Sequence, residues 1–145
     1  MYDKYINFNQ IVEDMIRYHN DNVIALNSLE EMYAELKLND GVKAIQYDSG
    51  PVQTSVNADG MVNLAIQKEM LEKRIKELRE EDRVFRNAWE ALDEEEQQVL
   101  DLFLKTGIRK QDAVDAICDK LHCERATAYR RKDLALKRFK RLMFG

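Results

Sequence analysis

The chain has 145 residues, of which 45% are hydrophobic and 34% are charged, and its net charge is -4. This composition is sufficient for one compact core, or for a small domain with an extension, and it excludes a disordered chain. One proline and five glycines are too few for the many turns of a sheet protein, so we expect an all-α fold.

The net charge conceals a division between an acidic body and a basic end. Residues 1–104 carry 11 Lys and Arg against 22 Asp and Glu, whereas residues 105–145 carry 12 against 5, which gives the last segment a charge of +7. A basic segment on an acidic body is typical of a nucleic-acid contact surface, because each cation that meets a phosphate releases counterions. On charge alone, a solvated helix face remains the alternative.

No run of about 18 apolar residues and no basic, apolar leader occurs, so we expect neither a membrane span nor a secretory signal. We therefore expect a cytoplasmic protein. Its two cysteines, Cys118 and Cys123, would then be free thiols with a packing role.

The first 60 residues are predicted to form two short helices and an irregular connector. Apolar residues recur at helical intervals on both sides of "HNDN", residues 19–22. The interval from Asn39 to Gly60 holds three of the five glycines and the only proline, which favours irregular structure and a boundary. The predicted division of the chain is therefore 1–60, 61–92 and 93–145.

Residues 61–92 are predicted to form one long helix with a heptad pattern. The spacing of seven and its companion positions involve Met61, Leu64, Leu71, Ile75, Leu78, Phe85, Trp89 and Leu92. Lys68 and Asp82 interrupt this seam and could fix its register. The periodicity leaves open whether the seam joins a homo-oligomer or folds back on residues 1–38.

The remaining residues have the outline of a helix-turn-helix. Asp93 and Glu96 are spaced as a capping box, and Gly107 is expected to end the helix that they start. An amphipathic helix then precedes the "HCE" corner at residues 122–124, and a long basic helix follows it. In such a unit the second helix enters the major groove, and the first crosses the backbone above it.

This outline gives a set of candidate DNA-binding residues. Spacing on the second helix predicts that five side chains are buried: Ala128, Ala135, Leu136, Phe139 and Leu142. The candidates for the groove are Arg125, Thr127, Tyr129, Arg130 and Arg131, because Arg can bond guanine in two places and Thr can contact thymine. The candidates for phosphate contacts are Lys110, Gln111, Lys120, Lys137 and Arg138.

Two stretches resemble known families. "LDEEEQQVLDLFL" with "AICDKLHCERATAYRRKDLALKRFKRL" resembles the fourth region of bacterial sigma factors. "IQYDSGPVQTSVNADGMVN", "KEMLEKRIKEL" and the ending "ATAYRRKDLALKRFKRLMFG" resemble phage transcriptional regulators of the RinA and ArpU type, so the resemblance covers about residues 44–145.

The resemblance implies an all-α regulator in the bacterial host cytoplasm, with N-terminal helices, a long central helix and a C-terminal helix-turn-helix like sigma region four. It implies activation of phage late genes, binding to double-stranded promoter DNA and contact with host RNA polymerase, with the helix from Arg125 as reader. Where the family usually has Ser or Thr as the cap of that helix, this chain has Glu124. Glu is a poorer cap, and its carboxylate would repel phosphate or accept from a cytosine amine.

Other classes of function are disfavoured by spacing. Cys118, His122 and Cys123 are too few for a structural zinc site, and His19 is distant in sequence. There is no glycine-rich phosphate loop and no nucleophile paired with a base, so we expect no enzyme, catalytic residue, metal or cofactor. The alternatives are a small-terminase-like packaging protein, which would form a large ring, and a protein-binding adaptor, which would lack salt-dependent DNA affinity.

Overall fold

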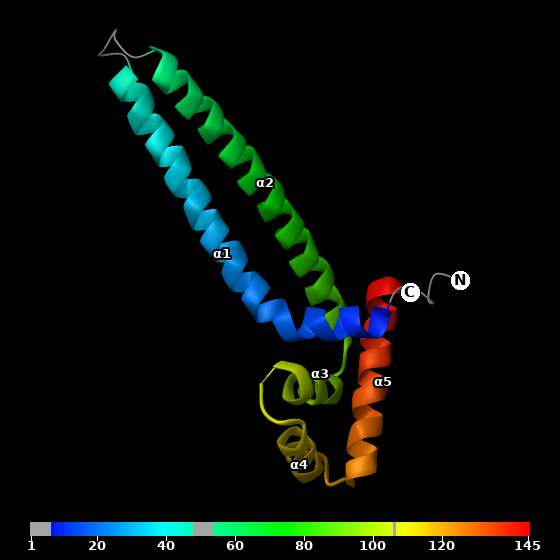
Figure 1. Ribbon diagram of the computed structural model, residues 1–145. Helices are drawn as coiled ribbons and strands as arrows, with labels where there is room; N and C mark the ends of the chain where they lie inside the picture. Colours follow the sequence, from blue (N-terminus) through cyan, green and yellow to red (C-terminus); the bar gives the residue numbers. More distant parts are fainter. Residues whose placement is uncertain (1–6, 48–53, 106) are drawn as a thin grey trace. The chain divides into compact units, whose positions relative to one another are not determined.

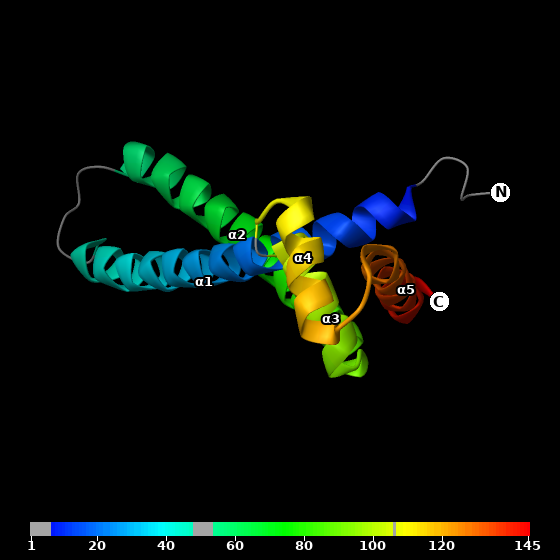
Figure 2. The same cartoon turned by 90° about the horizontal axis from the view of Figure 1, so that it is seen from below.

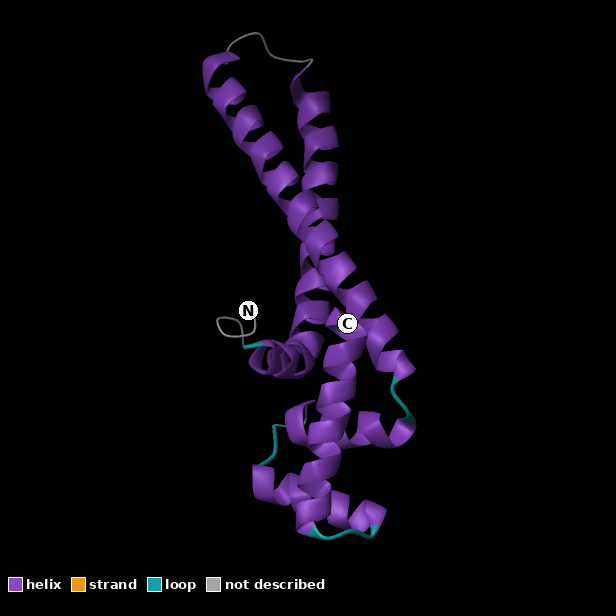
Figure 3. Ribbon diagram, turned by 90° about the vertical axis from the view of Figure 1, so that its right-hand side faces the viewer, coloured by secondary structure: helices purple, strands orange, loops and turns teal. Residues whose placement is uncertain are grey.

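The computed structural model describes residues 7–47, 54–105 and 107–145, and their side chains within 7–39, 60–105 and 107–145. Throughout this described part the regular elements are helices, with no strand (Figure 3). In chain order these are α1 (Phe8–Tyr47), α2 (Thr54–Ala91), α3 (Glu94–Leu100), the π-helical η2 (Asp101–Lys105), α4 (Lys110–Leu121) and α5 (Arg125–Phe144). The predicted all-α class is confirmed.

The helices pack as two compact units. One, here called the terminal unit, consists of Met1–Asn20 and Asp82–Gly145, and the other, here called the hairpin unit, consists of Asp21–Glu81. Helix α1 crosses the boundary after Asn20, and α2 crosses the boundary after Glu81, so each of these long helices contributes to both cores. The predicted division at residues 60 and 92 rests on sequence pattern rather than on packing, and it stays a prediction.

Helix α1 is one continuous helix where two short helices were predicted. Helix α1 continues through residues 19–22, where the polar "HNDN" led us to expect a break. In the structure the ring of His19 stacks on Phe85 with centroids 3.9 Å apart, and its Nε2 lies 2.9 Å from Oδ1 of Asp82. Tertiary contacts therefore hold a polar turn of the helix in place, and the interruption of the seam at Asp82 is explained by this partner.

Much of the predicted irregular connector is also helical. Helix α1 extends to Tyr47 and α2 begins at Thr54. Gly60 lies inside α2, where an added Cβ would meet nothing within 4 Å. The remaining part of the predicted connector, residues 48–53, lies outside the described residues.

The hairpin unit consists of antiparallel parts of α1 and α2, cyan and green in Figure 1. Its buried residues are Leu26 of α1 and Ile75 and Leu78 of α2, with Leu29 and Tyr33 packed against them. The heptad seam at these positions therefore folds back on α1. Met61 does not follow this pattern, because it is 57% exposed.

Two polar contacts join the helices of the hairpin unit beside this core. Arg79 and Glu30 form an ion pair at 2.7 Å, and the Tyr33 hydroxyl donates a hydrogen bond to Glu72. The latter bond raises the pKa of Tyr33, since it stabilises the protonated phenol. Both contacts are exposed, so they orient the helices more than they stabilise them.

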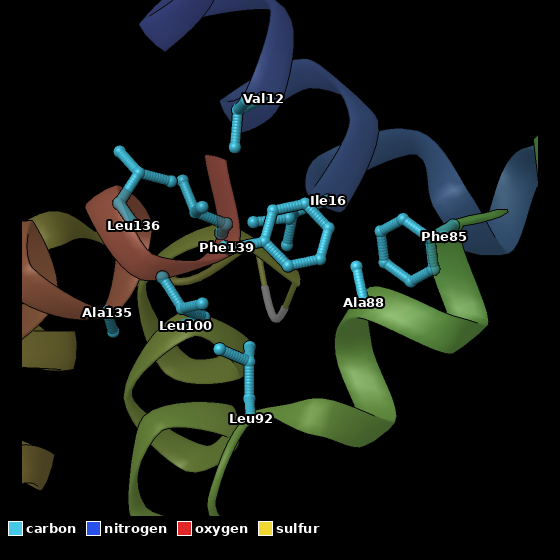
Figure 4. Close-up of a cluster of buried hydrophobic side chains, with 10 residues drawn as sticks. Val12, Ile16, Phe85, Ala88, Leu92, Leu100, Ala135, Leu136 and Phe139 are labelled. Carbon is cyan, nitrogen blue, oxygen red and sulfur yellow. The ribbon is translucent and has the colours of Figure 1, made fainter. Parts of the chain in front are cut away.

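The core of the terminal unit gathers side chains from α1, α2, α3 and α5 (Figure 4). Its labelled members are Val12, Ile16, Phe85, Ala88, Leu92, Leu100, Ala135, Leu136 and Phe139. Phe139 is fully buried, and its ring meets Phe85 and Trp89 edge-on at centroid distances of 5.3 and 6.0 Å. This core fixes α5 beside α3, and Figure 2 shows α5 nearly end-on next to α3 and α4.

Candidate nucleic-acid interface

Helix α3 begins with the predicted capping box. The Glu96 amide donates to the Asp93 carboxylate at 2.8 Å, and the Asp93 amide donates to the Glu96 carboxylate at 3.2 Å. The first of these bonds lowers the pKa of Asp93, because it favours the ionised carboxylate. Helix α3 then gives way to η2, and Gly107 has a φ of +66°, as a residue that ends a helix often does.

Replacing Asp93 with Ala is expected to lower the free energy of unfolding by about 1 kcal/mol at neutral pH, through loss of the cap. Because the folded-state pKa of Asp93 is lowered, this contribution is complete above the ordinary carboxyl pKa and is lost as pH falls through the lowered value. Urea unfolding of both chains at neutral and strongly acidic pH measures the difference. An undiminished difference in acid would contradict the assignment.

Helices α4 and α5 are joined by a tight corner. His122 has left-handed backbone angles, φ 50° and ψ 49°, and the Cys123 amide donates to the Cys118 carbonyl at 3.3 Å. This bond is the six-to-one bond of a Schellman motif, in which the flanking side chains usually touch. Here those side chains are the two thiols, and burial raises the pKa of Cys118. The cysteines therefore have the predicted packing role.

The N-terminus of α5 has no side-chain cap. Glu124 occupies the cap position with extended backbone, and its carboxylate accepts no capping hydrogen bond. Replacing Glu124 with Ser is expected to raise the free energy of unfolding by about 1 kcal/mol, because Ser can accept a bond from the first turn. Thermal unfolding at neutral pH measures this gain, and Glu124→Ala is the control that removes the carboxylate without adding a cap. A gain of equal size in both variants would contradict the capping explanation.

A small cluster of apolar side chains packs between the helices on either side of the corner and α3. Val99, Val114, Ile117 and Ala128 are buried together. The methyl side chain of Ala128 is fully buried, as predicted, and its small size lets α5 approach α4 closely. The prediction for Leu142 is wrong, since it is 42% exposed and Met143 packs against the core in its place.

The basic side chains of α5 fall into two groups. Arg130 and Lys137 are exposed and form no ion pair within the part of the chain that the structure describes. Arg131, by contrast, pairs with Glu95 of α3. Arg138 pairs with Glu96 and donates to the Ala91 carbonyl at 3.2 Å. The paired arginines attach α5 to the start of α3, whereas the unpaired cations face solvent.

Comparison with known families matches residues 43–140 to one described as a protein of unknown function, DUF1492, which is known in phage proteins. The chain belongs to the DUF1492 family. The match covers more than half of the chain, including all of α3, α4 and most of α5. No curated protein and no solved structure matches the chain.

At the corner of this DUF1492 chain, the first candidates for base contact differ in exposure. Arg125 forms an ion pair with Asp115 at 3.1 Å, and both side chains are more than 60% exposed. Such a pair is weak and can be exchanged for another anion. Thr127 is half-buried, so it offers less surface than the pattern suggested.

Tyr129 of α5 lies close to one side chain of η2 and one of α4. Its ring centroid is 5.9 Å from that of Phe103, and the ammonium of Lys110 lies 5.4 Å from the Tyr129 ring. Lys110 therefore borders Tyr129 at the start of α4, where Gln111 is also exposed. Lys120, at the other end of α4, is exposed as well.

Our sequence reasoning did not select Arg141 or Arg109. Arg141 is exposed on the same face of α5 as Arg130 and Lys137, since these positions are separated by four and seven residues. The same spacing could have identified it. Arg109 is exposed as the N-cap of α4, and it was missed because helix start signals do not include Arg.

Two features of the described part of the chain bear on other functions. No group of three or more His, Cys, Asp or Glu side chains within it is placed to hold a metal ion. None of its helices combines the length and apolar character needed to cross a bilayer.

Proposed function

We propose that this chain is a sequence-specific regulator of transcription that binds double-stranded DNA through α4, the corner and α5. The order of these elements is that of a helix-turn-helix, whose second helix presents its first turns to the major groove. The observation that carries the proposal is the outward face of α5, where Arg130 and Lys137 are exposed and unpaired in the described residues. An exposed, unpaired Arg keeps all its donors for guanine or phosphate.

The proposal divides the candidate residues into roles. Arg130 and Arg125 would contact base edges, the latter after releasing Asp115. Lys110, Gln111, Lys120 and Lys137 would contact phosphates. Arg131 and Arg138 would act mainly by holding α5 against α3, because their partners Glu95 and Glu96 already neutralise them.

We further propose that the protein activates phage late genes and acts with host RNA polymerase. This part rests on the resemblance to sigma region four and to RinA and ArpU regulators, and on membership of a family known in phage proteins. The acidic residues of the body would limit non-specific attachment to DNA, since residues 1–104 carry twice as many acidic as basic side chains.

The experiment is a footprint of the purified chain on DNA upstream of late genes in the source genome, followed by titration of the protected duplex and a scrambled duplex at several salt concentrations. We expect protection of a defined site, tighter binding to that duplex, and an affinity that falls linearly with the logarithm of salt concentration. Absence of binding to either duplex at low salt would refute the proposal. Equal binding to both duplexes would refute sequence specificity.

A further inference from the structure

The hairpin unit buries few of its large apolar side chains. Its buried core consists of Leu26, Ile75 and Leu78. Large apolar side chains of the same unit that are 49–71% exposed are Ile24, Met32, Leu38, Met61, Val62, Ile66 and Met70. Isolated exposed apolar residues are normal on a monomer, whereas a group of them that lies on one face indicates an interaction surface.

Three of these side chains form a stripe on α2. Val62, Ile66 and Met70 are spaced by four residues, so they lie along one face of the helix. Ile66 and the buried Ile75 are nine residues apart, which places them on opposite sides of α2. The stripe is therefore distinct from the seam that packs against α1.

A groove adjoins the stripe. Its volume is about 440 Å³, and its apolar lining includes Met32 and Leu36 of α1 and Met70 and Leu71 of α2. Met70 belongs to both the groove and the stripe, so the two form one continuous apolar surface. Methionine side chains are adaptable and suit a surface that receives another helix.

We propose that this stripe is the docking surface for a second copy of the chain, with the two α2 helices antiparallel about a two-fold axis at Ile66. In a two-fold interface the same patch serves both partners. The spacing satisfies that condition, because Ile66 is then opposite Ile66 of the second copy and Val62 is opposite its Met70. This inference does not rest on DNA binding.

The size of the surface is consistent with a dimer. With about 100 Å² from each half-exposed side chain, the stripe together with Met32 offers on the order of 400 Å² of apolar surface per copy, and flanking polar atoms bring this towards the roughly 800 Å² of a standard interface. The two α2 helices would bury the stripe between them, which adds a second apolar layer to the small core of each hairpin.

The charges around the stripe also favour a second copy. Glu69 and Lys73 border it and have opposite signs, and neither forms an ion pair within the described residues. A patch bordered by both signs does not repel its own copy. A nucleic acid is a poor occupant, because residues 21–81 carry 12 acidic and 7 basic side chains.

The first test is the molar mass of the full chain, measured by sedimentation velocity and light scattering over a wide range of concentrations. We expect a species of twice the 17.1 kDa of one chain. Ile66→Asp is expected to raise the dimer dissociation constant at least about tenfold, because it places two carboxylates at the axis. Leu134→Asp is the matched control, since Leu134 is 59% exposed but lies in the terminal unit; it should remain dimeric. A monomeric wild-type chain, or a larger ring, would overturn the proposal.

The second test determines the relative orientation of the two α2 helices, and it does not require the Ile66→Asp variant to be stable. In a chain with Cys118 and Cys123 replaced by Ala, Ile66→Cys is expected to form a linked dimer under mild oxidation. A mixture of Val62→Cys and Met70→Cys chains should link one variant to the other. Met70→Cys alone should not form a linked dimer, because its two copies would lie about 12 Å apart along the direction of the helices. Efficient linkage of Met70→Cys chains to each other would overturn the antiparallel arrangement.

Discussion

Replacing Phe139 with Ala is expected to lower the free energy of unfolding by about 3–5 kcal/mol. The side chain is fully buried and packs edge-on against Phe85 and Trp89. Its removal leaves a cavity where α5 meets α2, and both the transfer free energy and the aromatic contacts are lost. Trp89 is the only tryptophan of the chain, so its fluorescence reports directly on this core during urea unfolding.

Leu142→Ala is the control for this prediction. Leu142 lies in the same helix but is 42% exposed, so its truncation is expected to change stability by less than about 1 kcal/mol. The two side chains were equivalent in the sequence pattern, and only the structure separates them. Losses of similar size in both variants would contradict the placement of the core around Phe139.

Local signals in the sequence were sufficient to predict several elements. The capping box at Asp93 and Glu96 and the corner at residues 122–124 follow from residue types at fixed spacing. The inward face of α2 at Ile75, Leu78 and Phe85 follows from its periodicity. These features depend on neighbours within one or two helical turns, which the sequence displays directly.

Features that depend on distant neighbours were not predictable in the same way. The "HNDN" stretch looked like a break because its residues are weak helix formers, whereas the contacts of His19 with Phe85 and Asp82 keep it helical. Met61 and Leu142 fit the apolar period, but periodicity does not show where a packing partner ends.

The candidate site shows the same limit. Charge and helix position made four arginines of α5 candidates for DNA, but they could not show that Glu95 and Glu96 lie beside two of them, Arg131 and Arg138. The capping box thus has a second consequence: the carboxylates that stabilise the start of α3 also neutralise part of α5. The cationic surface left for a ligand is smaller than the charge of residues 105–145 suggests, and it is centred on Arg130.

This difference between paired and unpaired cations leads to a prediction for DNA binding. Arg130→Ala is expected to weaken binding to the cognate duplex by about 1–3 kcal/mol and to relax the preference at one base position, because a bidentate contact to a base edge is lost. Lys137→Ala should instead weaken cognate and scrambled duplexes alike and reduce the salt slope by about one. Both residues are exposed and unpaired in the described part of the chain, so neither substitution should lower stability appreciably.

Arg138→Ala is the matched control, because it removes the same charge from the same helix at a residue that is paired with Glu96. We expect it to leave the preference between duplexes unchanged and to lower the unfolding temperature, since it frees the start of α3 from α5. Titrations of both duplexes at several salt concentrations, with melting curves of each variant, separate these effects. If Arg130→Ala and Lys137→Ala lost the same affinity on both duplexes, Arg130 would be a phosphate contact and not a reader of sequence. If Arg138→Ala alone relaxed the preference, the reading surface would lie on the side of α5 that faces α3.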